Sequence, residues 1–358
     1  MTSDANVEAL VEEEVKRLRG ELDDYLGTVQ ALYAFADSAR WVEEERGLRS
    51  GSHRSIPRTM TVQSEEGPVA LTPDCVVQVI DSYGVVAEAK KHYRSAEDTS
   101  AFAQIAKYDQ PMLGWWTPNE EIERHDLVLI THYMSATRAC DAHKKWMSNG
   151  NSFERPFAIV EFNFSDQAST YFTLKRAAGS LSDRVHNEAL HNPKAIPEHL
   201  VIELIRKYKF YDADPPDVHT MLLLHDYIFP MLHREEDFDA LQDHEHPVLR
   251  ITVEEAQTRL AEQFCDPPHK ARQPRLPKSV WVRIALDRFV KLGLATCLPK
   301  EPDTFEIVLK KPRKKDTLEY FAERIVRLRL KADPDSRSRR AKKTKAAKGQ
   351  LPLFSRGD

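Results

Sequence analysis

The first 48 residues carry apolar side chains at the three- and four-residue spacing that is typical of amphipathic helices. The first run is Val7, Leu10, Val11, Val15 and Leu18, and the second extends from Leu22 through Leu26, Val29 and Leu32 to Trp41. We therefore expect two N-terminal helices, followed by a loop rich in Ser, Arg and Gly at 49–58.

Short runs of β-branched and apolar residues follow, and we interpret them as strands separated by helices. The expected strands are 58–64, 75–80, 85–91, 126–133, 157–164 and 171–177, and the expected helices are 100–110 and 136–147. The run 126–133 is continuously apolar, as in a strand covered on both faces. The order of one helix, three strands, a helix and a strand (αβββαβ) predicts an α/β core with a mixed central sheet.

After a break at about 186–200 the pattern becomes helical. We expect helices over 215–234, 252–264 and 276–293, and then two strands between 294 and 311. Thr252 and Glu255 form a capping box, and Gly293 ends the last helix. Three helices followed by a hairpin are typical of a winged helix-turn-helix, whose recognition helix would be 277–292. Its candidate phosphate contacts are Lys278, Arg283, Arg288 and Lys291. The alternative is a structural winged helix that mediates protein contacts.

These patterns divide the chain into four parts. N-terminal helices occupy 1–48, with the second leading into an α/β core at 49–185. A winged-helix-like domain occupies 196–312, and a final helix with a basic, disordered tail occupies 313–358.

Charge is distributed unevenly along the chain. Residues 310–348 hold 16 Lys and Arg against 5 Asp and Glu, although the whole chain has a net charge of −4. Such a basic segment either contacts a polyanion or only keeps the chain soluble. The four cysteines lie far apart, which argues against a zinc finger and against a disulfide framework. No apolar run is as long as a membrane span, and we expect a cytoplasmic, nucleoid-associated protein without membrane partners.

The segment "TPDCVVQVIDSYGVVAEAKKHY" (72–93) has acids and a lysine within an apolar hairpin. A three-residue loop with Gly84 in the left-handed conformation would put Asp74, Gln78, Glu88 and Lys90 on one face. In that register Gln78 faces Glu88, so that either a bend at Pro73 or a strong twist must bring Asp74 and Glu88 together. Two neighbouring carboxylates repel unless a cation lies between them, and Mg²⁺ or Mn²⁺ is suited to this role. With a nearby lysine, such a site hydrolyses phosphodiesters.

At these residues the sequence resembles the PD-(D/E)xK, or restriction-endonuclease-like, nuclease superfamily. The match is Pro73-Asp74 followed by Glu88-Ala89-Lys90, and Gln104 with Tyr108 is similar to the QxxxY motif of the RecB-like branch. The resemblance implies that Asp74 and Glu88 bind the metal, that Lys90 assists the attack, and that Gln104 and Tyr108 brace the site. It also implies an acid on the first core helix, for which we choose Glu44 among Glu43, Glu44 and Glu45. The alternative is an ordinary sheet with a solvent-exposed pair of Glu88 and Lys90.

The last residues, "GQLPLFSRGD", contain Gln350, Leu351, Leu353 and Phe354, which resemble the QLxLF peptide that binds the bacterial sliding clamp. A short apolar anchor behind a basic linker suits binding in an apolar pocket. The alternative is a tail that folds back on its own chain.

We therefore expect a Mg²⁺-dependent DNA nuclease, tethered to the sliding clamp, that acts in genome maintenance or in defence against foreign DNA. The alternative is a non-catalytic DNA-binding adaptor that is recruited to the clamp. The sequence leaves open whether the protein acts as a homodimer.

Overall fold

The computed structural model describes residues 4–47, 53–55, 59–64, 67–115, 120–165, 171–192, 194–197, 210–211, 213–235, 248–265, 277–308 and 316–332. The chain divides into two units. We name the unit of residues 24–215 and 258–277 the sheet unit, and the unit of residues 1–23, 216–257 and 278–358 the helical unit. The helices α1 (Asp4–Asp37) and α9 (Val253–Phe264) have residues in both units. No helix in the described part of the chain is long and apolar enough to cross a membrane.

The sheet unit is built on a seven-stranded mixed sheet in the order β1-β4-β5-β7-β8-β9-β10. Its strands are β1 (His53–Ser55), β4 (Cys75–Ile80), β5 (Tyr83–Ala89), β7 (Arg124–His132), β8 (Phe157–Ser165), β9 (Tyr171–Gly179) and β10 (Lys194–Pro197). Among these described strands, only the pairs β5–β7 and β7–β8 are parallel. The predicted α/β class with a mixed central sheet is thus confirmed.

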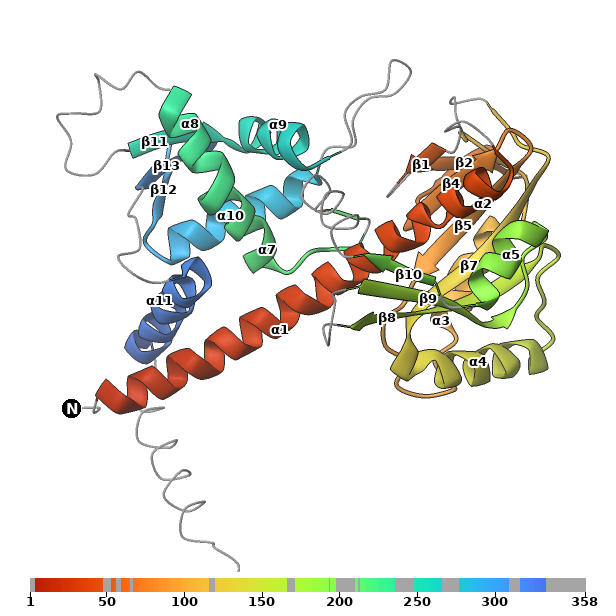
Figure 1. Ribbon diagram of the computed structural model, residues 1–358. Coiled ribbons are helices and arrows are strands. Elements are labelled where there is room, and N and C mark those ends of the chain that lie inside the picture. Colours follow the sequence, from red (N-terminus) through yellow and green to blue (C-terminus); the bar gives the residue numbers. More distant parts are fainter. Residues whose placement is uncertain are drawn as a thin grey trace, which may run out of the picture. The chain divides into compact units, whose positions relative to one another are not determined.

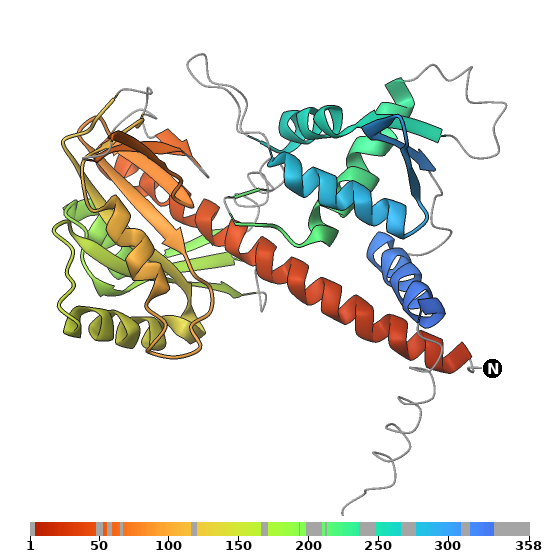
Figure 2. The same ribbon diagram turned by 180° about the vertical axis from the view of Figure 1, so that it is seen from behind.

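Helices cover both faces of this sheet, which explains why β7 is buried along nearly its whole length. The helices are α2 (Ala39–Glu45), α3 (Ser100–Ile105), α4 (Tyr133–Ser148) and α5 (Arg184–His191), with a 3₁₀ turn at Ala106–Tyr108. One core cluster joins Val77 and Val128 to the last turns of α1, and the other joins Val86 and Leu129 to Phe102 of α3. Figure 1 shows α5 in front of the sheet, and Figure 2 shows α3 in front of its other side.

The β4–β5 hairpin forms as expected, but its predicted register is wrong. Gln78 pairs with Gly84 rather than with Glu88, and the turn consists of Asp81 and Ser82 between Ile80 and Tyr83. Gly84 does not adopt a positive φ. It is a strand residue directly beneath Trp115, where a Cβ atom would overlap the indole ring. Burial of the Tyr83 ring within β5 therefore outweighs the turn preference of glycine.

Two further differences concern the edges of the sheet unit. The expected strand 58–64 forms β2 (Met60–Ser64), which does not join the central sheet but pairs with β3 (Gly67–Leu71) and β6 (Met112–Leu113) in a separate sheet. The stretch interpreted as a break forms α5 and β10, and β10 extends the central sheet beyond residue 185, where we placed the end of the core. Its Ile196 is buried, so this short segment contributes to the core.

The helical unit contains a three-stranded sheet in the order β11-β13-β12. Its elements are α7 (Asp217–Leu223), a π turn (Leu224–Ile228), α8 (Phe229–Glu235), β11 (Val248–Thr252), the start of α9, α10 (Ser279–Lys291), β12 (Ala295–Leu298), β13 (Glu301–Val308) and α11 (Thr317–Ala332). The Thr252 side chain caps α9 by accepting a hydrogen bond from the Glu255 amide at 3.0 Å, and Gly293 has a φ of 67°. The Thr252 half of the predicted capping box and the glycine at the end of α10 are thus confirmed. The strand β11 was not predicted.

Candidate active site

Asp74 and Glu88 lie opposite each other in the observed hairpin. Cys75 pairs with Ala87, and continuing this register by one residue places Asp74 opposite Glu88. The Asp74 Oδ2 atom accepts a hydrogen bond of 2.9 Å from the amide of Ala89. Asp74 is only 7% exposed, and Glu88 is half-buried. The two-residue turn and the irregularity between Gln78 and Ile80 therefore set the register that places Asp74 opposite Glu88, and Asp74 itself lies at a bend directly after Pro73.

Tyr108 connects these carboxylates to the helix that follows the hairpin. Its hydroxyl donates a hydrogen bond to Glu88 Oε1 and accepts one of 2.8 Å from Gln104 Nε2. Burial raises the pKa of the Tyr108 hydroxyl, and the charges of Glu88 and Asp74 raise it further. Gln104 and Tyr108 are four residues apart across the end of α3 and the 3₁₀ turn, and this spacing places both on one side of the turn. The structure therefore brings the QxxxY residues to the two acids.

Lys90 lies on the same side of the chain as Glu88, two residues further along. Its Nζ atom contacts Asp98 Oδ1 at 2.5 Å and Ser100 Oγ at 2.8 Å, and it lies 4.9 Å from the centre of the Tyr93 ring. The Lys90 hydrogen bond is the main cause of a lowered pKa at Asp98. The segment just before α3 thus holds the ammonium group.

The prediction for the acid on the first core helix falls on an exposed side chain. Glu44 lies near the end of α2 and is exposed, whereas its neighbour Glu43 is 6% exposed and buried with Val42. Successive helical residues are rotated by about 100°, so only one of two adjacent acids faces the core. Glu43 is therefore the inward-facing acid of α2, whereas the predicted Glu44 lies on the outer side of this helix.

Four residues beside this site, Asp24, Lys91, His92 and Tyr211, were missed by sequence reasoning. Asp24, on α1, contacts Lys91 Nζ at 2.9 Å and His92 Nε2 at 3.1 Å, directly after the Glu-Ala-Lys segment. Tyr211 is buried, and the charges of Asp74, Asp24 and Glu88 all raise the pKa of its hydroxyl in addition to the effect of burial. The sequence gives a weak indication of Lys91 and His92, because they directly follow the Glu-Ala-Lys motif. It gives no indication of Tyr211, which lies far from the motif in sequence.

The donor set fits a hard divalent cation. Mg²⁺ is commonly bound by one or two carboxylates together with water, and Asp74 with Glu88 provides two carboxylates at one place. In the described part of the chain, no three His, Cys, Asp or Glu side chains cluster closely enough to hold a metal ion. Asp74 and Glu88 are the residues that could hold such a cation.

The four candidate phosphate contacts of the helical unit do not share one face of α10. Arg283 contacts Asp287 at 3.3 Å and Asp303 at 2.5 Å, whereas Arg288 contacts Asp217 at 2.9 Å. The other two are Lys278, which lies over the Trp281 ring at 4.9 Å, and Lys291, which is exposed at the last turn.

The clamp-like residues Gln350, Leu351, Leu353 and Phe354 lie outside the described residues. Comparisons with protein-family models, with curated proteins and with solved structures found no match to this chain.

Proposed function

We propose that this protein is a nuclease that hydrolyses DNA phosphodiester bonds with Mg²⁺ or Mn²⁺. The observation that supports this most strongly is the position of Asp74 opposite Glu88, with the Asp74 carboxylate on the amide of Ala89. Two carboxylates opposite each other in one hairpin, with a lysine directly after its second strand, are poorly explained as a surface ion pair, because Asp74 is buried.

In this proposal Asp74 and Glu88 would hold the cation, which supplies Lewis acidity and lowers the pKa of its water when bound. Tyr108 and Gln104 orient the Glu88 carboxylate through their hydrogen bonds. Lys90 provides positive charge where the phosphate becomes more negative during hydrolysis.

Finer assignments belong to the same proposal. The sheet unit would have the restriction-endonuclease-like fold, for which the parallel β5–β7 pair joined through α3 is support. The helical unit would be a winged helix, supported by its order of helix, strand, two helices and two strands. Gln350, Leu351, Leu353 and Phe354 would bind the bacterial sliding clamp, placing the nuclease at replicating or repaired DNA in the nucleoid.

A non-catalytic DNA-binding adaptor is the second candidate, and the contact between Lys90 and Asp98 favours it. A lysine whose charge is compensated by a neighbouring carboxylate contributes less to stabilising a phosphate. In an adaptor, Asp74, Glu88 and Lys90 would serve only the packing of the hairpin.

One experiment separates the two candidates. The purified full-length chain is incubated with plasmid, single-stranded and branched DNA in Mg²⁺, Mn²⁺ or EDTA, together with the variants Glu88→Gln and Lys90→Ala. The matched control is Asp81→Asn, which removes an exposed acid from the turn of the same hairpin. The nuclease predicts metal-dependent cutting that both site variants abolish and the control retains. DNA binding without cutting on any substrate would favour the adaptor.

The clamp assignment is tested separately. Deletion of residues 350–354 is expected to abolish binding to a purified bacterial sliding clamp while DNA cutting is retained. Clamp binding that survives the deletion would refute the assignment.

A further inference from the structure

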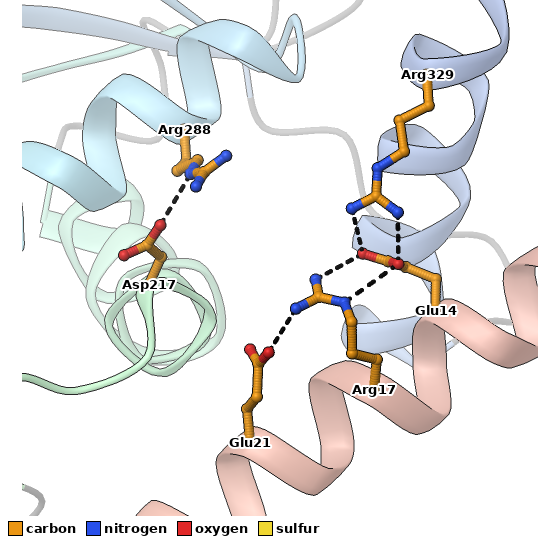
Figure 3. Close-up of polar contacts among 6 residues, drawn as sticks. All are labelled: Glu14, Arg17, Glu21, Asp217, Arg288 and Arg329. Carbon is orange, nitrogen blue, oxygen red and sulfur yellow. Dashed lines mark hydrogen bonds and ion pairs between the residues drawn. The ribbon is translucent and has the colours of Figure 1, made fainter.

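Several arginines of the helical unit, including Arg288 of the predicted phosphate contacts, already contact carboxylates. Figure 3 shows Arg17 and Arg329 converging on Glu14, with contacts of 2.7 Å from each, and Arg288 bound to Asp217. Glu14 is only 4% exposed, and although burial raises its pKa, the hydrogen bonds from the two arginines lower it overall. A phosphate would have to displace a carboxylate from each of these arginines.

The outer face of α10 is also poorly suited to a phosphate backbone. Its Arg283 lies between Asp287 and Asp303, which compensate its charge. The neighbouring Val280 and Ile284 are 53% and 39% exposed, so this face is partly apolar. Phosphate contacts in nucleic-acid complexes come mainly from uncompensated cations and polar groups.

A groove between the end of α10 and α11 is lined by cations whose charge is largely uncompensated. It is a cavity of about 450 Å³, and the cations on its lining are Lys291, Arg324, Arg327 and Lys331. Its one acid is Glu323, which forms an ion pair with Arg327. Among the described residues, Lys291, Arg324 and Lys331 have no carboxylate partner.

Two of the three uncompensated cations, Arg324 and Lys331, follow each other along α11. Arg324 is fixed by a hydrogen bond of 2.7 Å from its Nη1 atom to the carbonyl of Leu292, and it lies 5.1 Å from the Tyr320 ring. Lys331 follows Arg324 after two helical turns, about 10 Å along the axis of α11. This length spans about three phosphates of one strand of a duplex.

We infer that the groove lined by Lys291, Arg324 and Lys331 binds the phosphate backbone of a nucleic acid, and that the outer face of α10 does not. This deepens the proposed function, because it names the surface by which the helical unit grips DNA. It replaces Arg283 and Arg288 of the sequence-based set with Arg324 and Lys331, and it retains Lys291.

The test measures binding of the full-length chain to a fluorescein-labelled DNA duplex in EDTA, where no cutting occurs, over a series of salt concentrations. The variants are Lys291→Gln with Lys331→Gln, and the matched control is Arg283→Gln. The logarithm of the binding constant falls as the logarithm of the salt concentration rises, and each lost phosphate contact makes this negative slope shallower by about 0.9. We expect the double variant to make the slope shallower by about 2 and the control to leave it unchanged.

Two outcomes would overturn the inference. In one, Arg283→Gln lowers the slope while the double variant does not, which assigns DNA binding to the outer face of α10. In the other, the double variant loses binding to vesicles of anionic phospholipid while DNA binding is unchanged. A chain that binds DNA with the expected slopes but cuts no substrate would contradict only the nuclease.

Discussion

The Tyr108 hydroxyl donates a hydrogen bond to the Glu88 carboxylate, and Gln104 in turn donates to the Tyr108 hydroxyl. These two hydrogen bonds join the helical segment after α3 to the end of β5. In a metal site, such indirect partners orient the carboxylate that binds the ion. The relationship therefore has a consequence for metal affinity that can be measured.

Replacing Tyr108 by Phe should weaken metal-dependent cutting while the fold remains intact. Loss of a partner that orients a metal ligand typically costs about 10- to 100-fold in affinity or activity. We expect the Mn²⁺ concentration at half-maximal rate to rise by about this factor. The control is Tyr93→Phe, since the Tyr93 hydroxyl is buried without a hydrogen-bond partner among the described residues. Equal effects of both substitutions would contradict the role of Tyr108.

The two acids of α2 should differ in their effect. Glu43 is buried and Glu44 is exposed, so Glu43→Gln is expected to reduce cutting by about tenfold or more and Glu44→Gln to leave it unchanged. Rates at saturating Mg²⁺, with thermal unfolding curves of both variants, check this. A loss of activity confined to Glu44→Gln would restore the acid that the sequence suggested.

Gly84→Ala should destabilise the sheet unit because its Cβ atom would overlap the Trp115 ring. Overpacking of a core costs about 1–3 kcal/mol in the free energy of unfolding. The matched control is Gly20→Ala in α1, where no atom lies near the new methyl group and the helix should gain up to about 1 kcal/mol. Urea denaturation measures both effects. A smaller cost of Gly84→Ala in a Trp115→Leu background would identify the indole ring as the cause.

Two buried histidines should make the stability of the sheet unit depend on pH. Burial lowers the pKa of His186 to about 4 and that of His125 to about 4, whereas an unfolded histidine titrates near 6.5. The unfolded chain therefore takes up protons first as the pH falls. Their contribution to stability is complete above pH 6.5 and is lost progressively between about pH 6.5 and 4.

The size of this effect follows from proton linkage. Each histidine contributes up to about 1.4 kcal/mol per pH unit in this range. In denaturation curves from pH 7.5 to 4.5, His186→Gln should reduce the slope of stability against pH, whereas the exposed His191→Gln should not. An unchanged slope for His186→Gln would show that His186 takes up its proton equally readily in the folded and unfolded states.

The sequence by itself determined the elements whose patterns are locally unambiguous. The continuous apolar run 126–133 required a doubly covered strand, and β7 is one because apolar residues on both of its sides must be buried. The alternating hairpin, the Thr252 cap and Gly293 at the end of α10 were also readable, because each depends on neighbours within a few residues.

Only the tertiary structure decided the register of the hairpin, the inward-facing acid of α2 and the partners of the arginines. Gly84 is in β5 because Trp115, which is 31 residues away, occupies the space beside it. Glu43 rather than Glu44 is buried because of how α2 rests on its neighbours, and Arg283 is compensated by Asp303 of a strand that follows it. Such contacts join residues that are distant in sequence, and a local pattern carries no information about them.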